Sequence, residues 1–167
     1  MLKKLLLALL VALPISAAAQ KFGTFNVDEV ITAMPEITEM QQQLTDASQK
    51  YEAEFQKLQD ELNKLYTDYQ ANQNDPTTPE SIKERRQQEN QDRAQKVEQF
   101  RQTATQDLQR LQEQLLAPIQ QRINDAVKAV GQEGGFTFIF PLEPSLILYS
   151  GADVVDVTPL VKAKLGI

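Results

Sequence analysis

The sequence predicts an α+β protein in which a long antiparallel helical hairpin projects from a small β body. Two long stretches repeat apolar residues at steps of three and four, which is the period of an α-helix. A segment rich in Asn, Thr and Pro, near residues 72–79, separates the two stretches and predicts a tip. Short β-favouring runs precede the first stretch and follow the second, so the hairpin interrupts the β body.

Residues 1–19 have the layout of a cleavable secretory signal peptide. Lys3 and Lys4 precede an apolar run over residues 5–15, and small residues follow at 16–19. The apolar run is about eleven residues long, whereas a membrane-spanning helix needs roughly 20. A buried N-terminal helix is the alternative interpretation. The layout predicts export and a mature chain that begins at Gln20.

Composition excludes several function classes. The 167 residues contain no Cys and no His, so Ser/His/Asp and Cys/His catalytic sets cannot form, and the commonest metal ligand is missing. Gly134 and Gly135 lack the spacing and the lysine of a phosphate-binding loop. The net charge of −6 disfavours nucleic acid as a partner. We therefore expect no enzyme activity, no cofactor, no metal and no nucleic-acid binding.

Residues 20–35 and 131–167 are expected to form the β body. A strand over residues 21–27 leads into a short helix over 29–34, which Asp28 caps and Pro35 ends. After the glycine pair, strands are predicted over 136–140, 146–149 and 154–157, and a last helix over 159–165 capped by Thr158. Four short strands with little covering helix are marginal alone. We expect an oligomer whose β pieces complete one core.

Residues 36–130 are expected to form the hairpin arm, with a narrow apolar stripe on each helix as in a coiled-coil seam. The first stripe is Ile37, Met40, Leu44, Ala47, Tyr51, Phe55, Leu58, Leu62, Leu65 and Tyr69. The second stripe is Val97, Phe100, Ala104, Leu108, Leu111, Leu115, Ile119, Ile123, Ala126 and Val130.

Three further expectations concern the second helix of the hairpin. Thr78 is its predicted N-cap, with Pro79 at the first helical position. Pro118 lies inside it and is expected to kink or break it. Between Ile82 and Val97 only Ala94 is apolar, so the half near the tip is expected to be solvated and mobile.

Aromatic residues at or beside the stripes are the candidate binding residues. Packing between the two helices is one interpretation, because seam positions normally pack. Binding of exposed apolar segments of another polypeptide is the other, and Tyr66 is the best candidate because Leu65 already fills the regular seam step. The candidate set is Tyr66, Tyr69, Phe55 and Phe100.

A basic cluster lies close to the predicted tip and consists of Lys83, Arg85, Arg86 and Arg93. Attraction to anionic lipid headgroups or lipopolysaccharide is one interpretation. The other is a solvated face, because acidic residues between and beside these cations nearly cancel their charge. The near-cancellation favours the solvated face.

Three stretches resemble the Skp/OmpH family of periplasmic chaperones: KFGTFNVDEVITAMPE at 21–36, LLAPIQQRINDAVKAVGQEGGFTFIF at 115–140, and SGADVVDVTPLVKAKL at 150–165. The resemblance spans residues 20–167. It implies a homotrimer in the periplasm, with three helical arms around a cavity that holds unfolded outer-membrane β-barrel proteins without ATP.

The arm departs from the strongly basic pattern of some family members. Residues 41–120 carry fewer Lys and Arg than Asp and Glu, so neither capture of acidic clients nor a lipopolysaccharide site is carried over. Apolar and Gln-mediated contacts would then hold the client. The alternative function is that of a structural or adaptor coiled-coil hairpin protein of the cell envelope.

Overall fold

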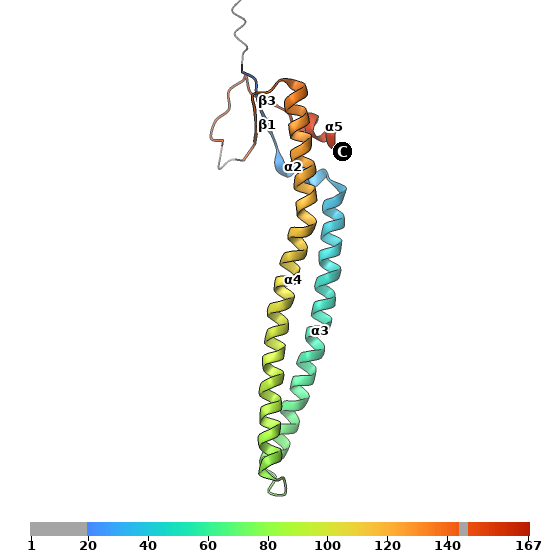
Figure 1. Cartoon of the computed structure of the whole chain (residues 1–167), viewed down its shortest axis with the longest axis vertical. Coiled ribbons are helices and arrows are strands. Elements are labelled where there is room, and N and C mark those ends of the chain that lie inside the picture. The colour runs from blue at the N-terminus through green and yellow to red at the C-terminus, as the bar shows by residue number, and fades with distance from the viewer. Residues whose placement is uncertain (1–19, 144–146) are drawn as a thin grey trace, which may run out of the picture. The chain divides into compact units, whose positions relative to one another are not determined.

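A computed structural model describes residues 20–143 and 147–167, and the predicted signal peptide lies outside them. The order of elements is β1 (Phe22–Phe25), α2 (Val27–Ala33), α3 (Pro35–Gln73), α4 (Glu80–Gly134), β2 (Phe138–Pro141), β3 (Val155–Asp156) and α5 (Thr158–Leu165) (Figure 1). The predicted fold class is confirmed, since two long helices form a hairpin and short strands form a small sheet.

The chain divides into two compact units. The hairpin unit contains residues 31–124. The sheet unit joins the described residues up to Val30 with residues 125–167. Segments far apart in the sequence therefore build the sheet unit together, and the long hairpin lies between them in the chain.

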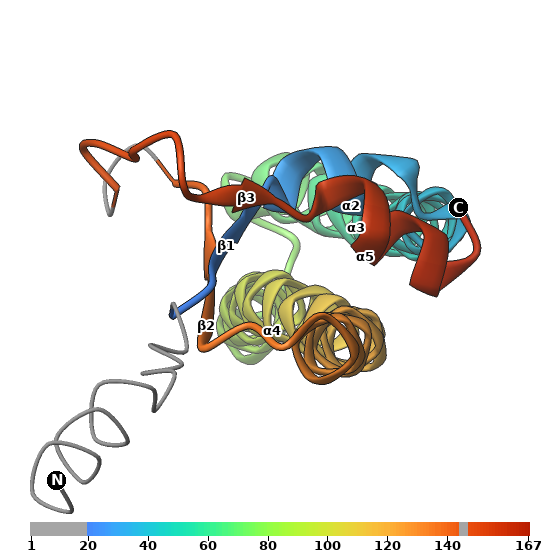
Figure 2. The same ribbon diagram turned by 90° about the horizontal axis from the view of Figure 1, so that it is seen from above.

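The sheet has three parallel strands in the order β2-β1-β3, with β1 in the centre (Figure 2). Phe22 lies opposite Phe138 and Gly23 lies opposite both Ile139 and Val155. Parallel pairing requires a long crossover between neighbouring strands. Here the helices α2, α3 and α4 form the whole crossover from β1 to β2.

The predicted strand over residues 146–149 is wrong for the part that the structure describes. Residues 147–149 belong to no strand, and Leu146 lies outside the described residues. The N–H of Ile147 donates to the carbonyl of Glu143 at 2.9 Å, which is a local turn rather than a ladder bond. The β-favouring residues here instead lie against one face of the sheet, as described below.

The core of the sheet unit lies between β1, α2 and α5. Val30, Val157 and Val161 are completely buried, and Thr158 and Leu165 nearly so. The buried positions of α5 recur at steps of three and four, so one stripe of this short helix packs inward. Gly135, at φ +64°, follows the end of α4 in the left-handed conformation that glycine favours, which confirms the predicted glycine stop.

Two of the predicted caps in the sheet unit are wrong. The Oδ1 atom of Asn26 accepts the N–H of Glu29 at 3.1 Å, so Asn26 caps α2 and Asp28 lies in its first turn. Thr158 lies inside α5, and its N–H donates to Oδ1 of Asp156 at 2.9 Å. The N-cap position of α5 is Val157, which makes no side-chain cap bond, and Asp156 precedes it.

The Thr158 hydroxyl ties β1, β3 and α5 together, and its loss is expected to destabilise the sheet unit. It donates to Asp156 Oδ1 at 2.6 Å and accepts the backbone N–H of Asn26 at 2.9 Å. Thr158→Val keeps the shape but leaves the N–H of Asn26 without its acceptor and removes one of the two hydrogen bonds to Asp156 Oδ1, which costs about 1–3 kcal/mol. Urea unfolding should show this loss, with Thr158→Ser much closer to wild type. Equal midpoints for the Val and Ser variants would contradict it.

In the hairpin unit α3 and α4 run antiparallel (Figure 1), and the two predicted stripes form the seam between them. Every residue of the first stripe is half-buried. In the second stripe Val97, Ala104, Ile119 and Ile123 are buried, and the members between them are half-buried. The periodicity of the sequence therefore identified the contact faces of both helices correctly.

Of the kink or break expected at Pro118, the break is wrong, because α4 is helical without interruption from Glu80 to Gly134, and the kink stays a prediction. Proline removes one backbone hydrogen bond of the helix and crowds the preceding turn. Pro118 itself is exposed, whereas Ile119 is only 4% exposed and Leu115 is half-buried. The seam therefore holds the helix on both sides of the proline.

The predicted N-cap of α4 is also displaced. The carbonyl of Pro79 accepts the N–H of Lys83 at 3.3 Å, so Pro79 itself precedes the first helical residue. The Thr78 hydroxyl donates to Oδ2 of Asp75 at 3.0 Å, and Thr77 donates to the same carboxylate through its N–H at 2.9 Å. These hydrogen bonds, the backbone N–H of Thr77 first, hold the pKa of Asp75 below its usual value.

Candidate functional surfaces

Two surfaces, rather than a catalytic centre, are the functional candidates. Within residues 20–143 and 147–167, no group of three or more acidic side chains is arranged to hold a metal ion. In the same ranges, none of the helices is long and apolar enough to cross a membrane. What remains is an open apolar face on the sheet unit and a polar stretch of the hairpin seam.

The first candidate is one face of the sheet. Because paired residues of parallel strands point to the same side, Phe22, Phe138, Thr24 and Phe140 share this face. The ring centroids of Phe22 and Phe138 are 6.3 Å apart, and those of Phe138 and Phe140 are 5.8 Å apart. Phe138 is 57% exposed and Phe140 is 46% exposed. The rings thus form a continuous apolar row open to solvent.

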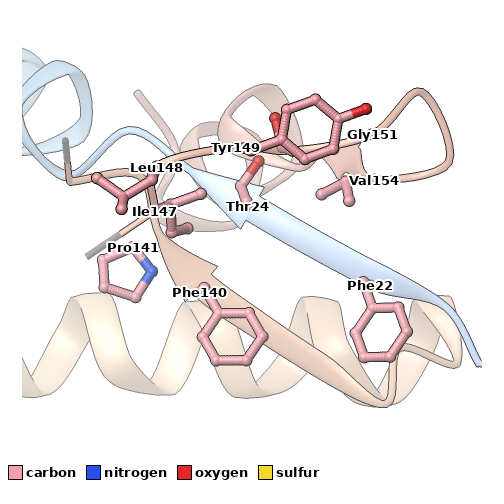
Figure 3. A pocket seen from close by; sticks show the side chains of 10 residues that line it. Phe22, Thr24, Phe140, Pro141, Ile147, Leu148, Tyr149, Gly151 and Val154 are labelled. Atoms are coloured by element: carbon pink, nitrogen blue, oxygen red, sulfur yellow. The ribbon is translucent and has the colours of Figure 1, made fainter. Parts of the chain in front are cut away.

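Residues 147–151 lie above this face and complete an open cleft of about 710 Å³, here named the sheet cleft (Figure 3). It is lined by Phe22, Thr24, Phe140, Pro141, Ile147, Leu148, Tyr149, Ser150, Gly151 and Val154. Leu148 is 92% exposed and Tyr149 is 86% exposed. Contiguous exposed apolar surface of this kind marks an interaction site in soluble proteins.

The opposite face of the sheet is closed by the end of α4. A Cβ atom on Gly131 would lie 3.5 Å from Ile139, and one on Gly23 would lie 3.1 Å from the Phe136 ring. The ammonium of Lys21 stands 4.1 Å from the centroid of that ring and donates to the carbonyl of Gly134 at 3.1 Å. The face that carries Gly23 and Ile139 is therefore packed against the end of α4 and Phe136, whereas the row of phenylalanine rings is open.

The four predicted binding residues are spread along the hairpin unit and are not brought together. Phe55 and Tyr69 are half-buried at seam positions, about 21 Å apart along α3. Phe100 packs across the seam against Tyr51, with ring centroids 6.1 Å apart. Tyr66 lies beside the seam and is 54% exposed. Phe100 thus contributes to the seam, while Tyr66 is open to solvent.

A polar contact lies next to the Tyr51–Phe100 pair. The phenol of Tyr51 donates to Oδ2 of Asp107 at 3.1 Å, and Arg110 pairs with Oδ1 of the same carboxylate at 3.0 Å. The hydrogen bond to Asp107, followed by burial, raises the pKa of Tyr51. The phenol therefore remains a neutral donor at physiological pH, and the contact joins α3 to α4 in the middle of the hairpin.

The second candidate is the seam near the tip, where α4 is mostly exposed, as expected, but three polar residues lie at the seam. On α4 the spacing of three and four residues continues from Ile82 to Val97 through Arg86, Asn90 and Arg93, which are all half-buried. Ala94, the apolar residue of this stretch, is exposed. Arg86, Asn90 and Arg93 are here named the polar seam. A search for apolar residues missed them, although their spacing continues the stripe.

Each residue of the polar seam contacts α3. The guanidinium of Arg93 pairs with Glu61 at 2.9 Å. The Asn90 amide donates to the carbonyl of Leu65 at 3.3 Å and to that of Arg86 at 3.0 Å. Arg86 approaches the carbonyl of Asp68 at 3.5 Å. The two helices are therefore joined here by polar side chains that belong to α4.

Most residues of the basic cluster near the tip form polar contacts within the hairpin unit. Arg93 and Arg86 make the contacts just described, and Arg85 lies 3.6 Å from Glu89 on the same helix. Arg85 agrees with the solvated-face interpretation, whereas Arg86 and Arg93 are half-buried at the seam. Contact with anionic lipid or lipopolysaccharide stays a prediction.

A model of the family described as outer membrane protein (OmpH-like) matches residues 21–165. The chain belongs to the OmpH-like family. The resemblance seen in the sequence is thereby confirmed.

Among solved structures, the fold of this OmpH-like protein is similar to that of a proposed outer membrane chaperone (OmpH-like) from Caulobacter crescentus CB15. The TM-score is 0.72 at 15% identity, over 87% of this chain and 83% of the other. At this identity the likeness concerns the fold. No curated protein sequence matches the chain.

Proposed function

We propose that this OmpH-like protein is an ATP-independent holdase of the periplasm. It binds unfolded outer-membrane β-barrel proteins and prevents their aggregation. The observation that carries the proposal is the match to the OmpH-like family, together with an exposed aromatic sheet cleft that requires a partner. The apolar surface of the sheet unit requires a partner, and the long hairpin adds a large surface for weak contacts.

Self-association is the proposed use of the sheet cleft. Phe138, Leu148 and Tyr149 are too exposed for a chain that remains alone, since burial of one large apolar side chain contributes about 1.5–3 kcal/mol. Neighbouring copies that cover each other's clefts would form a closed ring. The proposed assembly is the homotrimer, in which residues 20–35 and 131–167 form the β body.

Client binding is the proposed role of the hairpin arm, residues 36–130. Tyr66 and Tyr69, with Phe55 and Phe100, are the proposed contact residues. The flanks of the seam are rich in Gln and acidic overall, so many weak contacts rather than one charged site would hold the client. Weak, distributed contacts keep a client soluble without fixing its conformation.

A structural or adaptor role in the cell envelope is the alternative function. A spacer needs a rigid arm with a regularly packed tip. The polar seam gives the part next to the tip few apolar contacts, which favours a chaperone arm over a spacer. Slow proteolysis across residues 72–96 would favour the spacer instead.

Tyr66→Ala tests the client-binding part of the proposal. Because Tyr66 is exposed, its truncation should leave the free energy of unfolding within about 0.5 kcal/mol of the wild-type value. It should raise the concentration of chaperone needed to suppress aggregation of a urea-diluted outer-membrane barrel protein by about threefold or more. Phe100→Ala serves as the contrast, because it should lower stability through the Tyr51 contact. Unchanged suppression by Tyr66→Ala would remove Tyr66 from the client site.

A further inference from the structure

The seam next to the tip is apolar on one helix only. On α3 the stripe continues toward the tip through Leu58, Leu62, Leu65 and Tyr69, all half-buried. On α4 the facing positions between Ile82 and Val97 belong to the polar seam. In the rest of the hairpin unit both stripes are apolar, with Ala104, Ile119 and other members of the second stripe buried. One stretch of α3 thus lacks an apolar counterpart.

The polar contacts that hold this stretch closed are weak. The side chains of Arg93 and Glu61 are 33% and 52% exposed, and ion pairs this open to solvent contribute little to stability. The bond from Asn90 to Leu65 is long at 3.3 Å. The amide oxygen of Asn90 is buried and accepts no hydrogen bond from the described residues. Opening the seam would hydrate that oxygen. Separation of the helices therefore costs the polar groups of α4 little hydrogen-bonding free energy.

A cleft of about 250 Å³ already lies on this part of the seam. Its apolar lining comes from Leu65 on α3, and its other lining residues, all charged, are Glu89, Asp92, Arg93 and Lys96 on α4. A segment that is apolar on one edge and polar on the other fits such a surface. The transmembrane strands of barrel proteins alternate apolar and polar residues in this way.

We propose that residues 82–97 of α4 form a gate over the apolar stripe of α3. In the open state the stripe from Leu58 to Tyr69, with Tyr66 beside it, binds the apolar edge of an unfolded outer-membrane strand. The polar edge of that strand meets the charged residues of α4. Identification of the occupant rests on the proposed holdase function, whereas opening of the gate does not.

The gate makes a specific prediction for hydrogen exchange of the mature chain without client. Amides of residues 58–72 and 82–97 should exchange at least tenfold faster than those of residues 40–55 and 100–117 on the same two helices. Replacing the polar seam by Arg86→Leu, Asn90→Leu and Arg93→Leu together should slow exchange near the tip by tenfold or more, because both stripes are then apolar. Arg93→Leu alone should give an intermediate rate.

A matched control keeps the charge change and the added leucines but places them on exposed positions. Arg85→Leu, Gln91→Leu and Arg101→Leu together remove the same two charges and one amide, and all three positions are exposed. The control should leave exchange near the tip unchanged and still suppress aggregation of an unfolded barrel protein. The closed-seam variant should lose most of that suppression.

The outcomes separate the gate from the proposed function. Uniform exchange along the hairpin, or exchange that the closed-seam variant does not slow, would overturn the gate. A closed seam that still holds the client as wild type does would refute the α3 stripe as the client site while the holdase stands. If even the wild-type chain holds no client, the holdase fails and the occupant with it, and the exchange rates still decide whether the gate opens.

Discussion

Phe138→Glu together with Phe140→Glu is expected to convert the proposed trimer into monomers. Both rings lie on the open face of the sheet, 57% and 46% exposed, so the substitutions cost little within one chain. In an assembly that covers the sheet cleft they would place two carboxylates per chain in an apolar interface. Uncompensated buried charge is among the most costly changes a protein interface can receive.

The measurement is the light-scattering mass of the mature chain, with circular dichroism to show that the helices remain. The mass of the double variant should be one third of the wild-type mass. Tyr66→Glu is the matched control, because it places a carboxylate on an equally exposed aromatic position of the hairpin unit and should leave the mass unchanged. A double variant with the wild-type mass would show that the sheet cleft is not the interface.

Pro118→Ala is expected to stabilise the hairpin by about 2 kcal/mol. A proline inside a helix costs about 3 kcal/mol, because it removes a hydrogen bond and crowds the preceding turn. The greater freedom of the unfolded chain with alanine offsets up to about 1 kcal/mol of this gain. Pro118 is exposed, so its ring makes little packing that alanine would lose.

Thermal and urea unfolding at one protein concentration measure the effect of Pro118→Ala. The neighbouring exposed substitution Ala117→Gly provides the matched control and should destabilise by about 1 kcal/mol, the usual cost of glycine in a helix. An alanine variant less stable than wild type would mean that the hairpin depends on the local geometry that proline imposes.

The hairpin was predictable from the sequence because its signal is repeated many times. Ten residues from Ile37 to Tyr69 recur at one period, and each of them lies in the seam. Pro76 and Pro79 mark the tip locally, because proline is unfavourable in the interior of a helix and these two stand among turn-forming residues. A signal repeated over many turns tolerates single exceptions such as Pro118.

The polar seam was not predictable by the same means. Arg86, Asn90 and Arg93 continue the period, but an argument from apolar residues passes over them. Their role depends on what faces them across the hairpin, such as Glu61 and the carbonyl of Leu65. A search for period independent of polarity would have found the three positions.

The predictions of helix caps and of one strand were wrong for a related reason. Several oxygen-bearing side chains stand at each helix start, and Asn26 rather than Asp28 caps α2 because its side chain reaches the N–H of Glu29. Residues 147–149 have strand-favouring side chains, yet the ladder partner of a strand is set by long-range pairing. The parallel order β2-β1-β3 joins residues more than a hundred positions apart and leaves no local mark.

The proposed function requires that an assembly of this chain holds unfolded outer-membrane proteins in solution. The most direct test is the light-scattering mass of residues 20–167, alone and after addition of a urea-diluted outer-membrane barrel protein. We expect a trimer that gains the mass of one client and stays soluble without ATP. A monomer or dimer that leaves the client to precipitate would show that this chain is not such a holdase.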